Sequence, residues 1–201
     1  MKRNVAATLI VGMCLAAGSA LMFGQTAPTA QAPAASGSIN AEVIRMLDAA
    51  GNNMIRLAEA FPPEKYTWRP MEGVRSVSEV FLHVAGGNIG IARAAGAQPP
   101  ADFVAQGFDR STTEKAKVVD WLRRSLDLAR QAVQNVSDED MNKSGNLFGR
   151  PATWREILFY RSSHAHEHLG QAIAYARMNQ IVPPWTEEAQ QRQQQQPAKR
   201  P

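Results

Sequence analysis

Long amphipathic segments separated by proline pairs constrain this 201-residue chain more than any other feature. Within each segment apolar residues recur every three to four positions, the spacing that places them on one face of an α-helix. The segments run from about 40 to 61, 76 to 96, 112 to 136 and 153 to 179. Proline pairs at 62–63, 99–100 and 183–184 follow three of them, and proline cannot continue a helix. We therefore predict an all-α fold, a four-helix bundle.

Two of the predicted helices begin with a recognisable capping sequence. Ser76 and Glu79 fit the S-x-x-E capping box, in which each side chain satisfies a backbone N–H of the first turn. Thr153 and Glu156 repeat the pattern at the last helix. Apart from a short extended piece at 66–69, no segment alternates as a strand does. The connections at 62–75 and 96–111 are long for a bundle, so we expect them to cover one end of it or to shape a pocket.

The N-terminal residues have the order of a secretory signal. Lys2 and Arg3 precede an uncharged, largely apolar run at 5–23. We predict a signal peptide over 1–24 and a flexible linker over 25–38, and hence export to the periplasm or the extracellular space. An uncleaved membrane anchor is the alternative, because the run approaches the length of a spanning helix. Small residues at 16–20 favour cleavage, after which we expect no contact with the membrane.

The folded domain is expected to span residues 39–185. The tail at 186–201 is rich in glutamine and, from Gln190 onward, has no core-forming residue. A segment that cannot bury apolar surface does not offset the entropy of ordering it. We therefore predict a disordered tail.

Cysteine content and charge exclude several functions. Cys14 is the only cysteine and lies in the apolar run, so the cleaved chain would have no disulfide, cysteine nucleophile or thiolate ligand. The formal charge of +4 falls to +2 without Lys2 and Arg3, and the remaining basic residues are mixed with acids. This pattern excludes a phosphate-binding stripe for nucleic acid. We expect a small-molecule substrate, and the sequence leaves a homodimer open.

Three of the four histidines lie in one five-residue stretch inside the last predicted helix. His164 and His168 are four apart and fall together on one flank of the buried stripe, whereas His166 falls on the opposite flank. The pair can direct two imidazoles at one point, although a histidine-rich surface without metal is the alternative. The H-E-x-x-H pattern of zinc proteases is absent, because Gly170 stands where its second histidine would be.

His83 is the candidate for a third ligand. It lies opposite the centre of the apolar face of the second predicted helix, where a surface histidine is the ordinary interpretation. Its neighbours on that side include Gly86, Gly87 and Gly90, and each glycine costs a helix about 1 kcal/mol relative to alanine. Such glycines are explained if a backbone, a loop or a ligand approaches closely. Three neutral imidazoles that leave one position open form the ligand set of a catalytic metal site.

Several short motifs resemble those of the DinB family. They are Tyr66-Thr67-Trp68-Arg69-Pro70, the stretch 76–85 that contains His83, His164-x-x-x-His168-Leu169-Gly170-Gln171, Tyr175, and Val182-Pro183-Pro184. In that family the histidine pair is usually followed by Arg-Gly-Gln, and here Leu169 replaces the arginine. The resemblance covers roughly residues 40–184. It implies a DinB-like four-helix bundle in which His83, His164 and His168 bind one divalent cation, commonly zinc or nickel.

The resemblance implies two classes of function. One is a metal-dependent enzyme of unknown substrate: related proteins include thiol-dependent transferases and isomerases, and a hydrolase is equally open because small thiols are cytosolic. The other is a non-catalytic helical bundle that binds a metal, a small ligand or a partner protein.

Other side chains have both a functional and a structural interpretation. Glu79 is expected to close the capping box, with a role as a general base or as a partner of an imidazole as the alternative. Arg161 is expected either to attract an anionic substrate or to pair with a nearby glutamate. The aromatic residues Tyr66, Trp68 and Trp154 either line the mouth of a pocket or belong to the core.

Overall fold

The computed structural model describes residues 38–195, which form five α-helices, three short 3-10 helices and one two-stranded sheet. The predicted signal peptide, nearly all of the predicted linker and residues 196–201 lie outside the described part. The α-helices are α1 (Ile39–Ala60), α2 (Val77–Ala94), α3 (Lys115–Gln134), α4 (Trp154–Met178) and α5 (Pro184–Gln195). The short 3-10 helices are η1 (Pro63–Lys65), η2 (Phe108–Arg110) and η3 (Asp140–Asn142), and the strands are β1 (Ser144–Leu147) and β2 (Arg150–Thr153).

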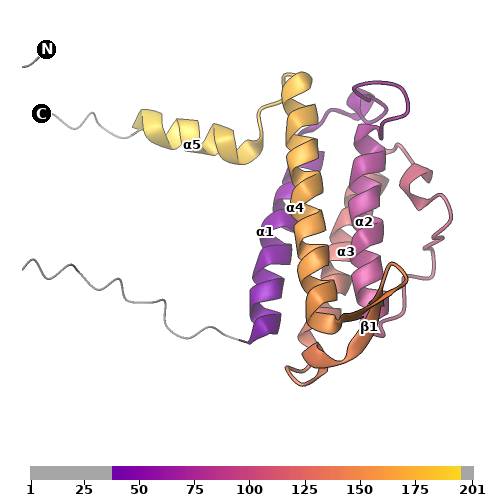
Figure 1. Cartoon of the computed structure of the whole chain (residues 1–201). Helices are drawn as coiled ribbons and strands as arrows, with labels where there is room; N and C mark the ends of the chain where they lie inside the picture. The colour runs from indigo at the N-terminus through magenta and orange to yellow at the C-terminus, as the bar shows by residue number, and fades with distance from the viewer. Residues whose placement is uncertain (1–37, 196–201) are drawn as a thin grey trace, which may run out of the picture. The chain divides into compact units, whose positions relative to one another are not determined.

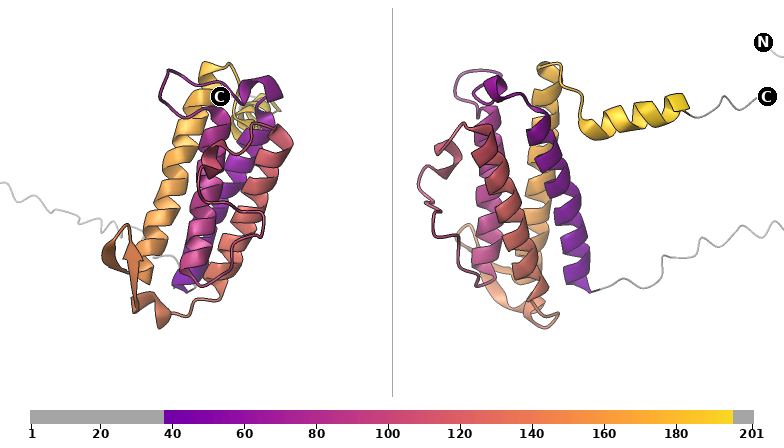
Figure 2. Two further views of the ribbon diagram at one scale, coloured as in Figure 1. Left: turned by 90° about the vertical axis from the view of Figure 1, so that its right-hand side faces the viewer. Right: turned by 180° about the vertical axis from the view of Figure 1, so that it is seen from behind.

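Helices α1 to α4 form the predicted bundle, in which α4 contacts both α1 and α2 (Figure 1). The bundle places the start of α3 beside the end of α1, where Lys115 Nζ donates to the carbonyl of Phe61 over 2.8 Å. The start of α2 lies beside the far half of α4, where the Tyr175 hydroxyl donates to the carbonyl of Arg75 over 3.1 Å. Helices α2 and α3 run in the same direction. The loop at 95–114, which joins them, therefore runs back along the length of the bundle (Figure 2).

The start of α2 confirms the predicted capping box. Ser76 Oγ accepts from the backbone N–H of Glu79 over 3.3 Å, and the backbone N–H of Ser76 donates to Glu79 Oε2 over 2.7 Å. At α4 only half of the predicted box forms. Thr153 Oγ1 accepts from the N–H of Glu156, whereas the Glu156 carboxylate pairs with Arg150 over 2.7 Å. Both caps fix where the histidine-bearing helices begin.

The core lies between the four helices and contains the apolar stripes that the sequence predicts. Its largest fully buried side chains include Phe61, Tyr66, Phe81 and Leu122. Tyr66 satisfies its hydroxyl inside the core by donating to the carbonyl of Ala58 over 2.8 Å. A buried hydroxyl needs such a partner, so Tyr66 is a structural residue.

The β1–β2 hairpin corrects the expectation that only 66–69 would be extended. Residues 63–67 form η1 and a turn, and the strands lie at 144–153 instead. A two-residue turn at Phe148 and Gly149, with φ values of 52° and 87°, joins them. Positive φ at both positions is typical of tight hairpin turns. The strands have four residues each and include glycine, asparagine and proline, so they show no period-two pattern.

Helix α5 corrects the prediction of a disordered tail from residue 186. Pro184 occupies its first position, and its glutamines, glutamates and alanine are good helix formers. Trp185 packs against the core, Glu188 pairs with Arg56, and the Arg56 guanidinium lies 6.0 Å from the centroid of the Trp185 ring. The prediction ended the domain at Trp185 and weighed only core-forming residues beyond it, so it neglected the helix propensity of the residues that follow.

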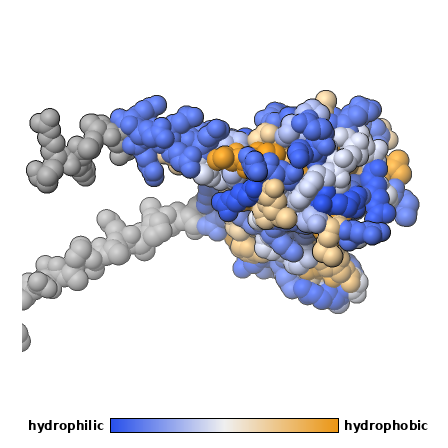
Figure 3. Space-filling view, turned by 90° about the horizontal axis from the view of Figure 1, so that it is seen from above, coloured by the Kyte–Doolittle hydropathy of each residue, from blue (hydrophilic) through white to orange (hydrophobic). Residues whose placement is uncertain are grey.

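The surface of α5 is almost wholly hydrophilic (Figure 3). No helix within residues 38–195 has an apolar stretch long enough to cross a membrane.

Candidate metal centre

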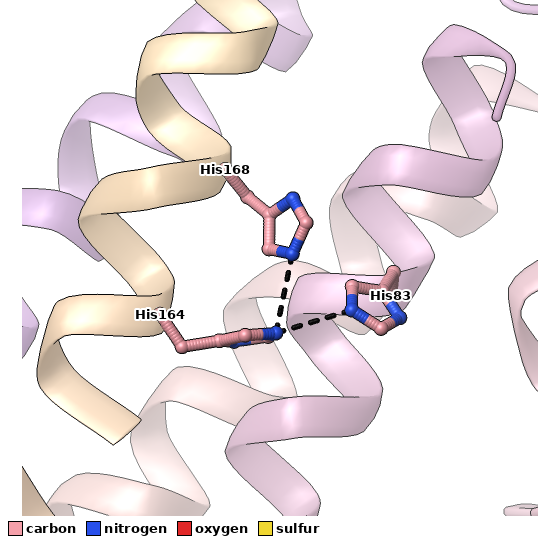
Figure 4. A group of neighbouring side chains, drawn as sticks. All are labelled: His83, His164 and His168. Carbon is pink, nitrogen blue, oxygen red and sulfur yellow. Dashed lines mark hydrogen bonds between the residues drawn. The ribbon is translucent and has the colours of Figure 1, made fainter. Parts of the chain in front are cut away.

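The contact between α2 and α4 brings together the three histidines that the sequence singled out. His83 points from α2 toward His164 and His168 on α4 (Figure 4). The Nε2 atoms of His83 and His164 lie 3.1 Å apart, and those of His168 and His164 lie 3.2 Å apart. One ring nitrogen from each residue lies within 4.8 Å of the other two. The rings thus converge on one point although His83 and His164 are 81 residues apart.

The spacing of these nitrogens fits a bound cation. A zinc ion with Zn–N bonds of about 2.0–2.1 Å and tetrahedral angles holds its ligand nitrogens about 3.3 Å apart. The observed 3.1 and 3.2 Å are close to that value. A neutral imidazole has a single N–H, so Nε2 of His164 cannot donate to both neighbours. A cation at the point of convergence would satisfy all three nitrogens at once.

The electrostatic surroundings keep two of the rings neutral. Burial lowers the pKa of His83 to about 4, with a further contribution from the positive charge of Arg75. Burial also lowers the pKa of His164 to about 4, assisted by the neighbouring His168. Metal binding requires the unprotonated imidazole. Both side chains are therefore in the ligating form at neutral pH.

A chain of hydrogen bonds orients His168. The carbonyl of Arg75 can only accept, so the Tyr175 hydroxyl donates to it and in turn accepts from Gln171 Nε2 over 3.0 Å. This leaves Oε1 of Gln171 facing Nδ1 of His168 at 2.8 Å. Because Oε1 only accepts, Nδ1 of His168 carries the proton and Nε2 offers its lone pair to the cluster. From the sequence, Gln171 and Tyr175 were named only among the motifs of the DinB family and were given no role.

His166 lies away from the cluster, as its position on the helix predicted. Its side chain is exposed, and its Nδ1 lies 2.9 Å from the carbonyl of Ser162 on the preceding turn. The pattern His164-x-x-x-His168 therefore supplies two members of the cluster, and the adjacent histidine supplies none.

The glycines of α2 allow the close approach that the sequence suggested. A Cβ atom at Gly87 would lie 3.2 Å from Cε1 of His164, and one at Gly86 would lie 3.3 Å from the ring of Phe108. At Gly90 a Cβ would lie 3.4 Å from a guanidinium nitrogen of Arg161. Side chains from α4 and from the loop at 95–114 thus pack closely on the α2 backbone at Gly87 and Gly86, which explains two glycines that cost helix stability, whereas the contact at Gly90 is of ordinary length.

A cavity of about 570 Å³ adjoins the histidine cluster. Its walls come from α2, α4, the loop at 95–114 and the turn of the hairpin. It is lined by Leu82, His83, Gly86, Gly87, Gly90, Arg93, Phe103, Ala105, Phe108, Asp109, Phe148, Tyr160, Arg161 and His164. The expectation that the long connection after α2 shapes a pocket is confirmed, whereas its aromatic residues were not predicted as site residues.

For several residues the sequence left a functional and a structural interpretation open, and their contacts favour the structural one. Glu79 is buried, closes the cap of α2, and contacts Arg69 and Arg110 at 3.4 Å. Trp68 packs edge-on against Tyr175 with ring centroids 5.3 Å apart, and so supports the hydrogen-bonded chain behind His168. Neither Trp68 nor Trp154 lines the cavity.

A sequence model of the DinB superfamily matches residues 46–172, which include all three histidines of the cluster. The chain belongs to the DinB superfamily. No match is found among proteins of curated function.

Several solved structures share the fold. A DinB-like protein from Bacillus cereus is 17% identical, with a TM-score of 0.62 over 71% of this chain and 93% of its own. A DinB-like protein from Bacillus subtilis is 18% identical, with a TM-score of 0.57 over 70% and 93%. A conserved protein from Enterococcus faecalis is 16% identical, with a TM-score of 0.60 over 71% and 97%. At these identities the likeness concerns the fold alone.

Proposed function

We propose that this DinB-superfamily chain is a metal-dependent enzyme that acts on a small molecule, as a hydrolase or as a thiol-dependent transferase. His83, His164 and His168 would hold one divalent cation, with zinc or nickel as the expected metals. The observation that carries this proposal is the convergence of three Nε2 atoms beside a cavity that His83 and His164 both line. A cation held there by three imidazoles would supply Lewis acidity toward a water, a thiol or a carbonyl group.

The other residues of the site have roles that follow from their contacts. Gln171 holds the ring of His168 with its lone pair toward the cluster. Phe103 and Phe108 pack edge to face, with ring centroids 4.7 Å apart, and form an apolar wall of the cavity. Asp109 is the only carboxylate among the residues that line the cavity, so it is the candidate to accept a proton during hydrolysis.

The non-catalytic alternative has one observation in its favour. The carboxylates near the cluster are engaged by arginines: Glu79 contacts Arg69 and Arg110, and Asp109 lies 3.5 Å from Arg75. Within residues 38–195 no carboxylate hydrogen-bonds to any of the three rings. A bundle that only binds a metal or a ligand needs no free general base.

We further propose that the protein is exported. The support is the basic pair Lys2-Arg3 and the uncharged apolar run after it. Cleavage of this run would also remove Cys14, the only cysteine of the chain. N-terminal sequencing of the protein recovered from the periplasm or the medium tests this. Recovery of the full chain from the cytosol alone would contradict it.

Metal analysis of the purified chain tests the metal site. We expect one divalent ion per chain in the wild type, and its loss in the variant His164→Ala, His168→Ala. The matched control is His166→Ala, which removes a histidine from the same helix and should keep the ion. Equal metal content in the wild type and the double variant would overturn the site.

A substrate screen separates the enzyme from the binding bundle. Metal-loaded protein is assayed with panels of esters, amides and phosphoesters and with thiol-transfer substrates, and His83→Ala serves as the control. Turnover that disappears in His83→Ala supports the enzyme. A loaded protein that turns over none of these panels supports the non-catalytic bundle.

A further inference from the structure

Arg161 is a half-buried cation that donates no hydrogen bond within the described residues. A guanidinium has five N–H donors, and none of them finds an acceptor within residues 38–195. Its Nε is buried without a partner. Glu156, a glutamate near Arg161 in the sequence, pairs with Arg150 instead. Burying a charge is costly unless it is paired, so an anion in the cavity would offset the cost that burial imposes on this guanidinium.

Other partly buried arginines in the bundle show the contrast. Arg130 lies 2.7 Å from Asp48, and Arg124 makes two bonds to Asp102 at 2.9 and 3.0 Å. Arg161 instead rests on the α2 backbone at Gly90 and lies 5.4 Å from the ring centroid of Phe148. The chain therefore positions Arg161 by packing and leaves its polar edge without an acid.

The cavity around Arg161 has the character of a site for an organic anion. Arg161 and Arg93 both line it, and neither forms an ion pair within the described residues. Its one acid, Asp109, lies 3.5 Å from Arg75. Phe103, Phe108, Phe148 and Tyr160 supply apolar and aromatic walls. A guanidinium binds a carboxylate through two parallel hydrogen bonds, and aromatic walls suit an apolar body.

We propose that Arg161 binds the carboxylate of a small organic acid whose apolar body lies between the aromatic walls of the cavity. This inference rests on the proposed function, because it places the other end of the acid at the histidine cluster. Arg161 precedes His164 by three residues on α4, which corresponds to about 4.5 Å along the helix axis. A molecule with a short spacer between its two polar ends spans that separation.

Calorimetric titration of the purified protein tests the proposal. The probes are benzoate, phenylacetate and 3-phenylpropionate, each compared with its neutral amide. Metal-free protein is titrated first, because a carboxylate can also bind a metal directly, and zinc-loaded protein is titrated second. We expect at least one acid to bind the metal-free wild type about tenfold or more tightly than its amide.

Variants of the arginine identify the group responsible. Arg161→Gln should weaken binding of the acid about tenfold or more. Arg161→Lys should bind the acid with an affinity between those of the wild type and Arg161→Gln, because it keeps the charge and loses the planar pair of donors. Arg177→Gln is the matched control: Arg177 is on the same helix, is exposed and does not line the cavity. Thermal melting of each variant verifies that it is folded.

The outcomes separate this inference from the proposed function. Equal binding by wild type and Arg161→Gln, equal binding of acid and amide, or no binding of any acid by the wild type would each overturn the anion site. Arg161-dependent binding by a protein that takes up no metal would support the anion site and overturn the metal-dependent function.

Discussion

The Oε1 atom of Gln171 lies 2.8 Å from Nδ1 of His168, the ring nitrogen that faces away from the other two histidines (Figure 4). Gln171 is itself fixed, because its Nε2 donates to Tyr175 and Tyr175 donates to a backbone carbonyl. The residue His168 is 9% exposed, so its ring has little freedom to turn. The bundle thus sets both the orientation of His168 and the nitrogen that carries its proton.

Replacing Gln171 should weaken metal binding without removing a ligand. Gln171→Leu deletes the acceptor for Nδ1–H, and loss of such a supporting partner typically costs 10- to 100-fold in metal affinity. Competition with a chromophoric chelator measures the dissociation constant. Gln171→Glu keeps an acceptor and should retain most of the affinity, and His166→Ala should retain all of it. A Gln171→Leu variant with wild-type affinity would show that packing alone orients the ring.

The metal-free protein should lose stability as the pH falls from about 6.5 to about 4. In the folded chain the pKa values of His83 and His164 are about 4, whereas an unfolded histidine has a value near 6.5. Between these values the unfolded chain binds more protons, so stability that is fully present above pH 6.5 is lost toward pH 4. Denaturant midpoints measured across this range for wild type and for His83→Gln, His164→Gln test it. The variant should show a shallower decline, and equal slopes would contradict the prediction.

Alanine substitutions at Gly87 and at Gly90 of α2 should have different effects on the metal site. At Gly87 a new Cβ would lie 3.2 Å from His164, so the imidazole must shift by a few tenths of an ångström and metal affinity should fall. At Gly90 the nearest atom would lie 3.4 Å away, an ordinary contact, and the better helix propensity should raise the unfolding free energy by up to about 1 kcal/mol. Metal titration and thermal melting of Gly87→Ala and Gly90→Ala test both effects. Equal metal affinities in the two variants would contradict the prediction that the close approach of His164 to Gly87 affects the metal site.

Metal should stabilise the folded chain in a concentration-dependent way. A ligand that binds only the folded state adds about 2.7 kcal/mol to the unfolding free energy when its free concentration is 100 times its dissociation constant. Zinc titrated into chelator-treated protein should therefore raise the melting temperature, and His164→Ala should abolish the rise. A rise that persists in His164→Ala would place the stabilising metal elsewhere.

The sequence predicted those parts of the molecule whose physics is local. Helix spacing and the Ser76–Glu79 box set α2 within one residue of its observed start, and the four-residue spacing paired His164 with His168. The approach of His83 depends on how α2 packs on α4, and apart from the resemblance to the DinB family only the adjacent glycines indicated it. The hairpin escaped prediction because its register depends on a turn with positive φ at Phe148, a residue that gives no turn signal. The aromatic walls lie in a long loop without periodicity, so no pattern marked them.

The distribution of the cluster over α2 and α4 has a consequence for how the protein is made. His83 emerges from the ribosome 81 residues before His164, and α3 lies between them in the chain. A nascent or truncated chain that ends before α4 therefore holds one imidazole of the three and has no means to chelate an ion. A metal ion bound by all three imidazoles, as proposed, would therefore enter the cluster only after α4 has been synthesised and has packed on α2.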